Sequence, residues 1–307
     1  MGEFSHIKVL MNDRFVDWDD ANVHVTTHAL LYGTGIFEGI RGYYNEARKQ
    51  MFVLKLEDHV KRLFKNMRLL RLSLSLTADE LAKEIVELIR LNDFREDVYI
   101  RPAIYFGLGS VGLDPSGHDI DYFVFAMPFG KYLDTEKGIS ACVSSWRRIT
   151  DNMLPPRGKI IGAYVNSVLA KQEAIASGYD EAILLTKDDF VCEGSGENIF
   201  LVRNDQLITP PVYADILEGI TRASLIELAG DLKHEVIERQ IGRTELCIAD
   251  EVFLCGTGAE VTPVVSIDGR LINDGKIGPI TKELKDKYFE IVRGNENRYA
   301  SWLTSVY

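Results

Sequence analysis

The chain has 307 residues, 46% of them hydrophobic and 26% charged, which is the composition of an ordinary folded globular protein rather than a disordered one. Its 35 Lys and Arg residues against 46 Asp and Glu residues give a formal net charge of −11, without a block of consecutive basic residues, so we expect no nucleic-acid partner. A chain of this length usually divides into two domains.

The N-terminal sequence MGEFSHIKVLMNDRF carries polar residues throughout and has no apolar run followed by a small-residue cleavage site, and nowhere do about 18 apolar residues run together. We therefore expect no signal peptide, no membrane partner and a cytoplasmic location. The four cysteines are far apart and lack both a C-x-x-C pair and a histidine at ligand spacing; they are Cys142, Cys192, Cys247 and Cys255. This pattern favours buried thiols over disulfides, and it predicts no metal site.

The first elements in chain order are two hairpins, over residues 6–18 and 37–56, each with short apolar runs around a polar turn. An amphipathic helix is expected over 56–72, where Val60, Leu63 and Met67 share one face. Thr77 and Glu80 form a capping box that predicts the start of a second helix. Residues 97–109 and 121–130 are rich in β-branched and aromatic residues, which indicates a return to the sheet.

A boundary is expected near Pro128 and Gly130, where charged residues gather. We predict a first domain over residues 1–127, a linker over 128–134, and a second domain over 135–307. The second domain is expected to contain a strand at 139–149, a helix at 162–178 and a helix at 221–232, with further strands at 181–186, 198–203, 234–241, 251–256 and 260–267. Strands grouped before and after helices favour an α+β fold over a doubly wound sheet.

Residues 33–39, GTGIFEG, superficially match a phosphate-binding glycine loop. A dinucleotide-binding G-x-G-x-x-G motif follows a buried strand and opens a helix. Here the sixth position is Glu38, the third glycine comes one residue late at Gly39, and the following residues IRGYYNE are strand-like. We therefore interpret the segment as a glycine-hinged connection between a helix and a strand.

Two other glycine clusters suit anion binding better. Gly219 precedes Thr221 at the start of an amphipathic helix, where backbone N–H groups favour a phosphate. Gly256, Thr257 and Gly258 form a turn after an apolar strand. Each pattern alone is also typical of ordinary capping, and the residues do not decide between the two.

A lone lysine is usually a solvated surface residue. Lys159, however, precedes Ile160 and Ile161 and lies five residues before Tyr164, surroundings that would desolvate its amine as Schiff-base chemistry requires. Glu193 precedes a glycine turn, where it could face a crevice or be an ordinary turn residue. A lysine, a phenol, a carboxylate for the ring nitrogen and a phosphate cradle are together what pyridoxal 5'-phosphate requires.

Six segments, spanning nearly the whole chain, extend this pattern: HALLYGTGIFEGIR (28–41), YIRP (99–102), GKIIGAYVNSVLAKQEA (158–174), EGSGENIFLV (193–202), ILEGITR (216–222) and CGTGAEVTPV (255–264). With them the sequence resembles the branched-chain amino-acid aminotransferases, of the fold-type IV class of pyridoxal-phosphate enzymes. The resemblance implies that the first domain is a smaller N-terminal α/β domain and the second a larger C-terminal cofactor-binding domain, with the cofactor between the two. It also implies a homodimer or a higher homo-oligomer.

The resemblance also implies roles for single residues. Lys159 is expected to be the catalytic Schiff-base lysine and proton shuttle, Glu193 to pair with the pyridine nitrogen, and Tyr164 to bond the ring hydroxyl oxygen. The phosphate is expected to be held by Arg62, Ile220, Thr221 and Thr257. Many relatives carry alanine where this chain has Gly258. The glycine keeps the backbone N–H donors but changes the turn.

The substrate-binding candidates implied by the resemblance are Tyr32, Phe37, Arg41, Tyr99, Arg101, Val111, Tyr132, Thr257 and Gly258. Tyr32, Phe37 and Tyr132 would wall the pocket for an aliphatic side chain. Arg41 and Arg101 would receive the distal carboxylate of 2-oxoglutarate. Val111 would lie on a loop that closes over a neighbouring subunit's site, and the backbone N–H groups of Thr257 and Gly258 would bind the substrate α-carboxylate.

The predicted function is transamination between branched-chain L-amino acids (leucine, isoleucine, valine) and 2-oxoglutarate by a ping-pong reaction. D-amino-acid aminotransferases, (R)-amine aminotransferases and aminodeoxychorismate lyases are alternatives that would share Lys159 and Glu193. An alternative of a different class is a non-catalytic nucleotide-binding or structural module that uses its glycines as hinges.

Overall fold

The computed structural model describes residues 4–130 and 133–307, and its chain divides into two compact units. Unit 1 comprises residues 1–130, 158–162 and 290–307, and unit 2 comprises residues 131–157 and 163–289. Two later segments therefore return to the first unit after the chain has entered the second. Within the described ranges, no helix is long and apolar enough to cross a membrane.

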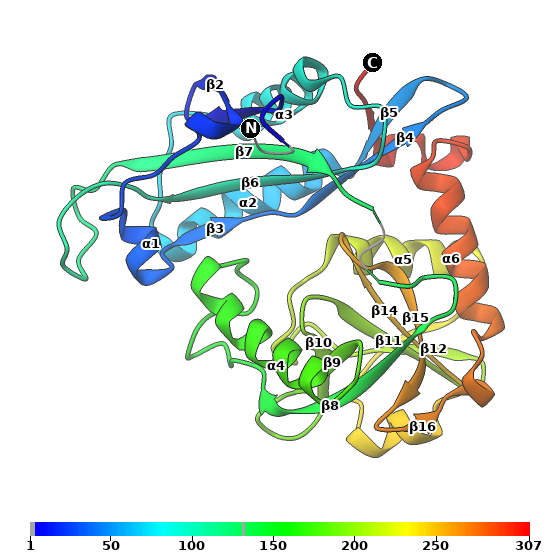
Figure 1. Ribbon diagram of the computed structural model, residues 1–307. Coiled ribbons are helices and arrows are strands. Elements are labelled where there is room, and N and C mark those ends of the chain that lie inside the picture. Colours follow the sequence, from blue (N-terminus) through cyan, green and yellow to red (C-terminus); the bar gives the residue numbers. More distant parts are fainter. Residues whose placement is uncertain (1–3, 131–132) are drawn as a thin grey trace. The chain divides into compact units, whose positions relative to one another are not determined.

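Unit 1 is built on a sheet of eight strands in the described part of the chain, in the order β17-β5-β4-β6-β7-β1-β2, with β3 also paired to β6 (Figure 1). The strands are β1 (Lys8–Met11), β2 (Arg14–Asp17), β3 (Gly35–Phe37), β4 (Ile40–Asn45), β5 (Gln50–Leu54), β6 (Val98–Phe106), β7 (Ile120–Pro128) and β17 (Leu303–Ser305). Every pair in this sheet is antiparallel, and β6 and β7 form its longest ladder. The two predicted hairpins are thus confirmed as β1–β2 and β4–β5.

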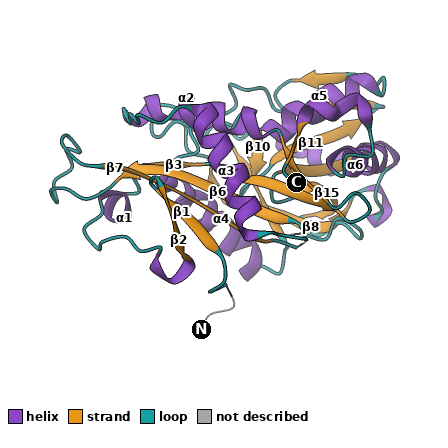
Figure 2. Cartoon of the chain, turned by 90° about the horizontal axis from the view of Figure 1, so that it is seen from above, coloured by secondary structure: helices purple, strands orange, loops and turns teal. Residues whose placement is uncertain are grey.

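The helices of unit 1 are α1 (His28–Tyr32), α2 (Leu56–Leu70) and α3 (Ala78–Asn92). Leu63 and Met67 on α2, and Leu81 and Ile85 on α3, are buried at helical spacing. Helix α3 packs on β1 and β7, α2 packs on β3, and the two helices contact each other (Figure 2). The Thr77 capping box is present, which confirms the predicted start of α3.

Unit 2 contains a sheet of nine strands among its described residues, in the order β10-β9-β8-β15-β14-β11-β12-β13, with β16 paired to β15. The strands are β8 (Ile139–Arg147), β9 (Glu181–Leu185), β10 (Val191–Gly194), β11 (Asn198–Arg203), β12 (Gln206–Thr209), β13 (Val236–Glu238), β14 (Glu251–Gly256), β15 (Glu260–Ile267) and β16 (Arg270–Leu271). Pairs β8–β9, β8–β15 and β12–β13 are parallel and the other pairs antiparallel. The predicted mixture of helices and sheets in two units is confirmed.

The helices of unit 2 begin with α4 (Tyr164–Ala176) and α5 (Ile220–Asp231), followed by α6 (Pro279–Val292), whose last residues belong to unit 1. Helix α4 packs on β8 and β9 (Figure 1), and α5 packs on β13 and β14. The apolar core of the sheet includes Ile183, Leu201 and Leu254, all fully buried.

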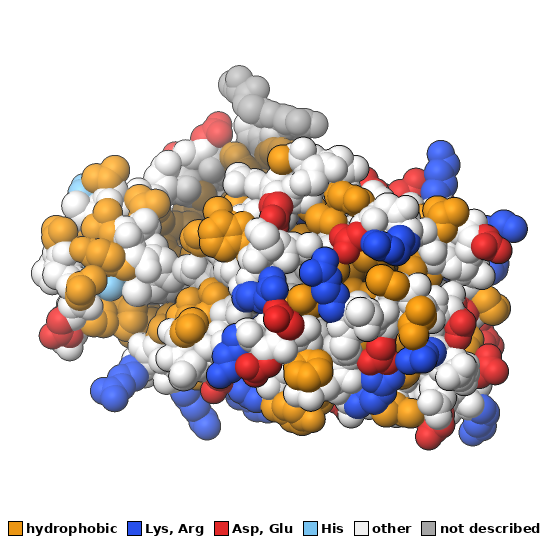
Figure 3. All heavy atoms as spheres, turned by 90° about the horizontal axis from the view of Figure 1, so that it is seen from below, with side chains coloured by type: hydrophobic (Ala, Val, Ile, Leu, Met, Phe, Trp, Pro, Cys, Tyr) orange, Lys and Arg blue, Asp and Glu red, His pale blue; other side chains and the backbone are white. Residues whose placement is uncertain are grey.

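The surface and the cysteines bear on two expectations from composition. On the face drawn in Figure 3, Lys and Arg side chains are interspersed with Asp and Glu side chains, so that face lacks a continuous basic area. Cys142, Cys192 and Cys255 are buried thiols as expected. The expectation was wrong for Cys247, which is exposed because it lies in the surface 3₁₀ turn Arg243–Ile248 rather than in a strand.

Candidate active site

Lys159 is fixed in unit 1 by main-chain contacts to the glycine segment and β3. The Phe37 amide donates a hydrogen bond to the Lys159 carbonyl oxygen at 3.0 Å, and the Gly162 amide donates to the Gly33 carbonyl oxygen at 3.0 Å. Ile36 and Ile160 form an antiparallel bridge between these contacts. The Lys159 amine lies 5.3 Å from the centre of the Phe37 ring. The segment that carries the lysine is therefore attached to β3 like a short extra strand.

The glycines of residues 33–39 make this attachment possible. Gly33 ends α1 with a left-handed backbone (φ 68°), and a Cβ atom there would lie 2.6 Å from the Gly162 Cα atom. A Cβ atom on Gly35 would lie 2.7 Å from a side-chain methyl of Ile161 and 2.8 Å from the Tyr105 Cβ atom. Helix α1 ends before these residues and β3 begins within them, so the predicted helix-to-strand connection is confirmed.

Gly33→Ala is expected to destabilise the protein by about 2–4 kcal/mol, since a left-handed alanine is strained and its methyl group would push against main-chain atoms. The same displacement would move Lys159, so a reaction that uses the Lys159 amine should slow in addition to the loss of stability. Gly117→Ala is the matched control, because Gly117 also has positive φ (80°) but open space around it. Urea unfolding and steady-state kinetics of both variants check this; equal effects of the two would contradict the role assigned to close packing.

Arg62, the expected phosphate-binding residue, lies on α2 in a buried cluster with two residues that the sequence did not indicate. Its Nε and Nη2 atoms donate to the two carboxylate oxygens of Glu38 at 2.7 and 2.8 Å, and His59 Nδ1 lies 2.8 Å from Glu38 Oε2. Burial would raise the pKa of Glu38, but Arg62 and the hydrogen bonds from both partners outweigh it, and the pKa lies well below its usual range. Because an ionised carboxylate only accepts, His59 Nδ1 must carry the proton of this bond.

In unit 1 the Arg101 guanidinium lies over the rings of Phe37 and Tyr99, and we call these three residues the Arg101 stack. The Arg101 guanidinium lies 4.3 Å from the centre of the Phe37 ring, and its Nε and Nη2 atoms donate to the Tyr99 hydroxyl at 3.2 and 2.5 Å. A Cβ atom on Gly39 would lie 2.3 Å from that hydroxyl, so Gly39 leaves the room that Tyr99 occupies. The structure thus brings together three of the expected substrate-binding residues.

The other expected substrate residues of unit 1 make contacts outside this stack, although Arg41 lies opposite Tyr99 in the pairing of β4 with β6. Tyr32 and Val111 are exposed and joined by a hydrogen bond of 2.7 Å from the tyrosine hydroxyl to the valine carbonyl oxygen. Arg41 is buried, with Nη2 donating to the carbonyl oxygens of Phe129 and Gly130 at 3.2 and 3.0 Å. Tyr132 lies outside the described residues.

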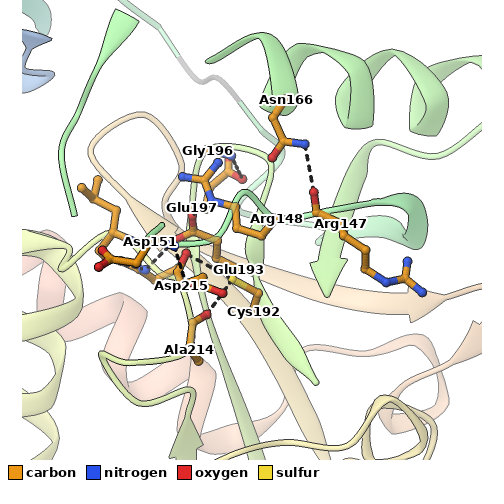
Figure 4. A network of polar contacts seen from close by, with 12 residues as sticks. Arg147, Arg148, Asp151, Asn166, Cys192, Glu193, Gly196, Glu197, Ala214 and Asp215 are labelled. Carbon is orange, nitrogen blue, oxygen red and sulfur yellow. Dashed lines mark hydrogen bonds and ion pairs between the residues drawn. The ribbon is translucent and has the colours of Figure 1, made fainter. Parts of the chain in front are cut away.

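Glu193 is the centre of a second polar cluster, in unit 2, which we call the Glu193 cluster: Arg148, Glu193, Asn198 and Leu217. Glu193 Oε1 forms an ion pair of 2.8 Å with Arg148 Nε (Figure 4). Glu193 Oε2 accepts hydrogen bonds from the Leu217 amide at 3.0 Å and from Asn198 Nδ2 at 3.3 Å. Asn198 Nδ2 also donates to the Leu217 carbonyl oxygen at 2.9 Å. A cation and two N–H donors stabilise the negative charge of the buried Glu193.

The remaining cofactor candidates of unit 2 lie at helix starts and one turn. Tyr164 is the first residue of α4, and Ile220 and Thr221 are the first residues of α5. The N-cap of α5 is Gly219, which has no side chain that could cap the helix. Amide groups at such a helix start are suited to an anion. Thr257 and Gly258 lie in the turn between β14 and β15, partly buried.

The comparisons with known proteins agree with this geometry. The family model described as amino-transferase class IV matches residues 35–267. A probable branched-chain-amino-acid aminotransferase of Aquifex aeolicus is 50% identical, covering 99% of this chain and 98% of the relative. The chain belongs to the class IV aminotransferases.

Solved structures extend the match. A branched-chain aminotransferase from Thermoproteus uzoniensis, crystallised with norvaline, has a TM-score of 0.94 at 46% identity and covers 98% of this chain and 99% of its own. A Thermobaculum terrenum enzyme in its pyridoxal-phosphate form has a TM-score of 0.94 at 42% identity, covering 99% of this chain and all of its own. The resemblance seen in the sequence is confirmed, as is the fold-type IV architecture.

Glu197 is a further buried carboxyl group of this aminotransferase, four residues after Glu193. Its Oε2 accepts a hydrogen bond from the Gly196 amide at 3.0 Å (Figure 4), and the neighbouring buried carboxylate Glu181 already pairs with Lys171 at 2.7 Å. Burial, with the charges of Glu181 and Glu193 adding to it, raises the pKa of Glu197 to about 8. At neutral pH this carboxyl group is therefore mostly protonated.

Sequence reasoning missed Arg148, Asn198, Glu38 and His59. Arg147 and Arg148 are consecutive residues near the end of the strand predicted over 139–149. Side chains alternate between the two faces of a strand, so one of the two arginines was expected to point inward. Arg147 pairs with the exposed Asp189, and Arg148 with the buried Glu193. The pattern thus contained a signal for an inward arginine, although it did not say which of the two.

Proposed function

We propose that this aminotransferase transfers amino groups between branched-chain L-amino acids and 2-oxoglutarate with pyridoxal 5'-phosphate as its cofactor. The observation that carries the proposal is Glu193, a buried carboxylate whose charge is maintained by Arg148 and two N–H donors. A protonated pyridine nitrogen requires such a partner, because only the protonated ring draws electrons strongly from the substrate. The names of the near-full-length relatives support the same substrate class.

The residues present fit this cofactor. Lys159 supplies an amine on a segment fixed by main-chain hydrogen bonds, and the uncapped first turn of α5 supplies amide donors for a phosphate. When bound, the cofactor provides the electron sink for breaking a bond at the substrate α-carbon. Lys159 attaches the cofactor and then moves the proton at the α-carbon, Glu193 holds the ring nitrogen, and Tyr164 holds the ring oxygen.

The substrate proposal rests on the stack of Phe37, Tyr99 and Arg101. An aliphatic side chain gains about 1.5–3 kcal/mol on leaving water for an apolar wall such as the Phe37 ring, which accounts for tolerance among leucine, isoleucine and valine. A distal carboxylate needs a cation, and Arg101 lies beside that ring. Arg41 remains the second candidate for this carboxylate, and Thr257 and Gly258 those for the α-carboxylate.

The half-reactions with single amino donors test this proposal. Mixed with the cofactor-loaded enzyme, L-leucine is expected to bleach the visible absorption band rapidly, whereas D-alanine and (R)-1-phenylethylamine should do so slowly. Fast bleaching by D-alanine with slow bleaching by L-leucine would instead support a D-amino-acid aminotransferase. A protein that stays colourless after incubation with the cofactor would support a non-catalytic module.

We further infer a homodimer or higher homo-oligomer. Leu30 on α1, and Val111 and Leu113 on the loop between β6 and β7, are large apolar side chains that are more than half exposed, and such groups often mark protein contacts. The hydrogen bond between Tyr32 and Val111 joins these two segments. Light scattering of the purified protein gives its mass in solution. A cytoplasmic location stays a prediction from the N-terminal sequence.

A further inference from the structure

Glu38 is a fully buried carboxylate to which the proposed reaction gives no role. It binds both Nε and Nη2 of Arg62 in parallel, a geometry that fixes the plane of the guanidinium group. The Glu38 amide donates to the Pro102 carbonyl oxygen at 2.9 Å, and the preceding amide of Phe37 holds the Lys159 carbonyl oxygen. Two consecutive residues at the end of β3 thus hold the two functional groups: Phe37 holds the Lys159 segment, and Glu38 holds Arg62.

Burial differs among the three members of this cluster. The side chains of Glu38 and His59 are 0% and 3% exposed, whereas that of Arg62 is 15% exposed. Arg62 is thus the member that a solute can reach, and the other two lie behind it. The Arg62 side chain has several rotatable bonds, which the Glu38 carboxylate restrains, and His59 in turn holds that carboxylate.

The energetics favour a functional reason for this arrangement. Removing a carboxylate and a guanidinium group from water is expensive, and a buried ion pair seldom stabilises a fold more than apolar residues of the same size would. The His59 ring adds no compensating charge, because burial, together with the charges of Arg62 and Lys159, lowers its pKa in spite of Glu38. What this cluster provides, and apolar residues could not, is a fixed orientation of the Arg62 guanidinium group.

We propose that Glu38, supported by His59, is a positioning residue that orients Arg62 toward the phosphate group of the cofactor and thereby sets the affinity for that group. The inference rests on the proposed function, because it assigns Arg62 to the phosphate. It extends that function by naming a carboxylate, which itself repels phosphate, as a determinant of phosphate binding.

The test compares two ligands of the apo-protein: pyridoxal 5'-phosphate and pyridoxal, which lacks the phosphate. In Glu38→Gln the dissociation constant for pyridoxal phosphate should rise about tenfold or more, the loss expected when a charge-assisted contact is misplaced, while that for pyridoxal stays within about twofold. In an Arg62→Met background, Glu38→Gln should change neither constant further. Equal weakening of both ligands, or no change in either, would overturn the proposal.

Two further variants guard against a trivial loss of folding. Glu38→Asp keeps the charge but shortens the reach, and it should lower the preference for pyridoxal phosphate in the same direction. Asp97→Asn breaks another two-point arginine–carboxylate pair of unit 1, with Arg293, and should reduce thermal stability without altering the ratio of the two constants. If the unsubstituted chain bound neither ligand, the proposed function would fail first. Normal binding and leucine turnover with an unchanged ratio in both Glu38 variants would refute only this inference.

Discussion

Lys159→Ala is expected to abolish transamination with L-leucine, with turnover falling by more than about 10³-fold, because the variant loses both the covalent attachment point and the group that moves the α-proton. The fold should persist, since the contacts that hold this segment are made by main-chain atoms that alanine also has. Stopped-flow absorbance and product assays measure the loss, and the visible band of the lysine-bound cofactor should be absent.

The matched control for this prediction is Lys61→Ala. Lys61 lies on α2 in the same unit, with its amine paired to Glu57 on the surface at 3.1 Å. Its removal should leave turnover within about twofold, because exposed ion pairs contribute little. Retention of the band and of leucine turnover in Lys159→Ala would rule out the assignment of Lys159, whatever the control shows.

Glu197→Gln is expected to stabilise the protein at alkaline pH relative to the unsubstituted chain. The pKa of the Glu197 carboxyl in the folded state, about 8, lies well above that of an exposed glutamate, so between these two pKa values the folded state holds a proton that the unfolded state has released. Stability of the unsubstituted chain therefore falls as pH rises through this window. The stability of Glu197→Gln relative to the unsubstituted chain should therefore increase steadily from pH 5 to pH 9.

Urea unfolding at a series of pH values measures this difference, and Glu245→Gln provides a control of the opposite sign. Hydrogen bonds from Arg239 lower the pKa of Glu245 to about 2 against the opposing effect of burial, so its stabilising effect is complete above pH 5 and is lost as pH falls toward 2. The effect of Glu245→Gln should thus be constant from pH 5 to pH 9. A Glu197→Gln difference equally flat across that range would show that Glu197 is ionised when folded.

Local patterns in the sequence were enough to predict many elements of the fold. The spacing of Leu63 and Met67 predicted α2, and the Thr77 capping box predicted the start of α3, because these signals act within a few residues. The strand β17 was not predicted, since it is only three residues long and its pairing with β5 joins residues about 250 positions apart. Short strands are defined by the partner they find rather than by their own composition.

The candidate site divides in the same way. Lys159 and Glu193 could be singled out because an apolar neighbourhood and a glycine turn flank them in the sequence. Glu38 appeared only as the residue that spoils a glycine motif, Arg62 was named only through the resemblance, and His59 was not singled out. Their cluster exists because β3 and α2 pack together, a contact that no single stretch of sequence contains.

The glycine segment is where prediction and structure complement each other best. The residues excluded a nucleotide loop and indicated a glycine-hinged connection between a helix and a strand. The structure shows what these glycines contact. Gly33 packs against Gly162, three residues after Lys159, and Gly35 packs against Ile161, two residues after it. Room for the lysine segment is thus a sufficient reason for these glycines.

The attachment of the Lys159 segment to β3 also bears on how this enzyme can change over time. Its hydrogen bonds use amides and carbonyls, which every residue except proline supplies in full. Replacement of the side chain at position 37 can therefore alter which substrates are preferred while the lysine stays where it is. Proline is excluded at positions 37 and 162, whose amides are donors. Selection can act on specificity here with little risk to the chemistry.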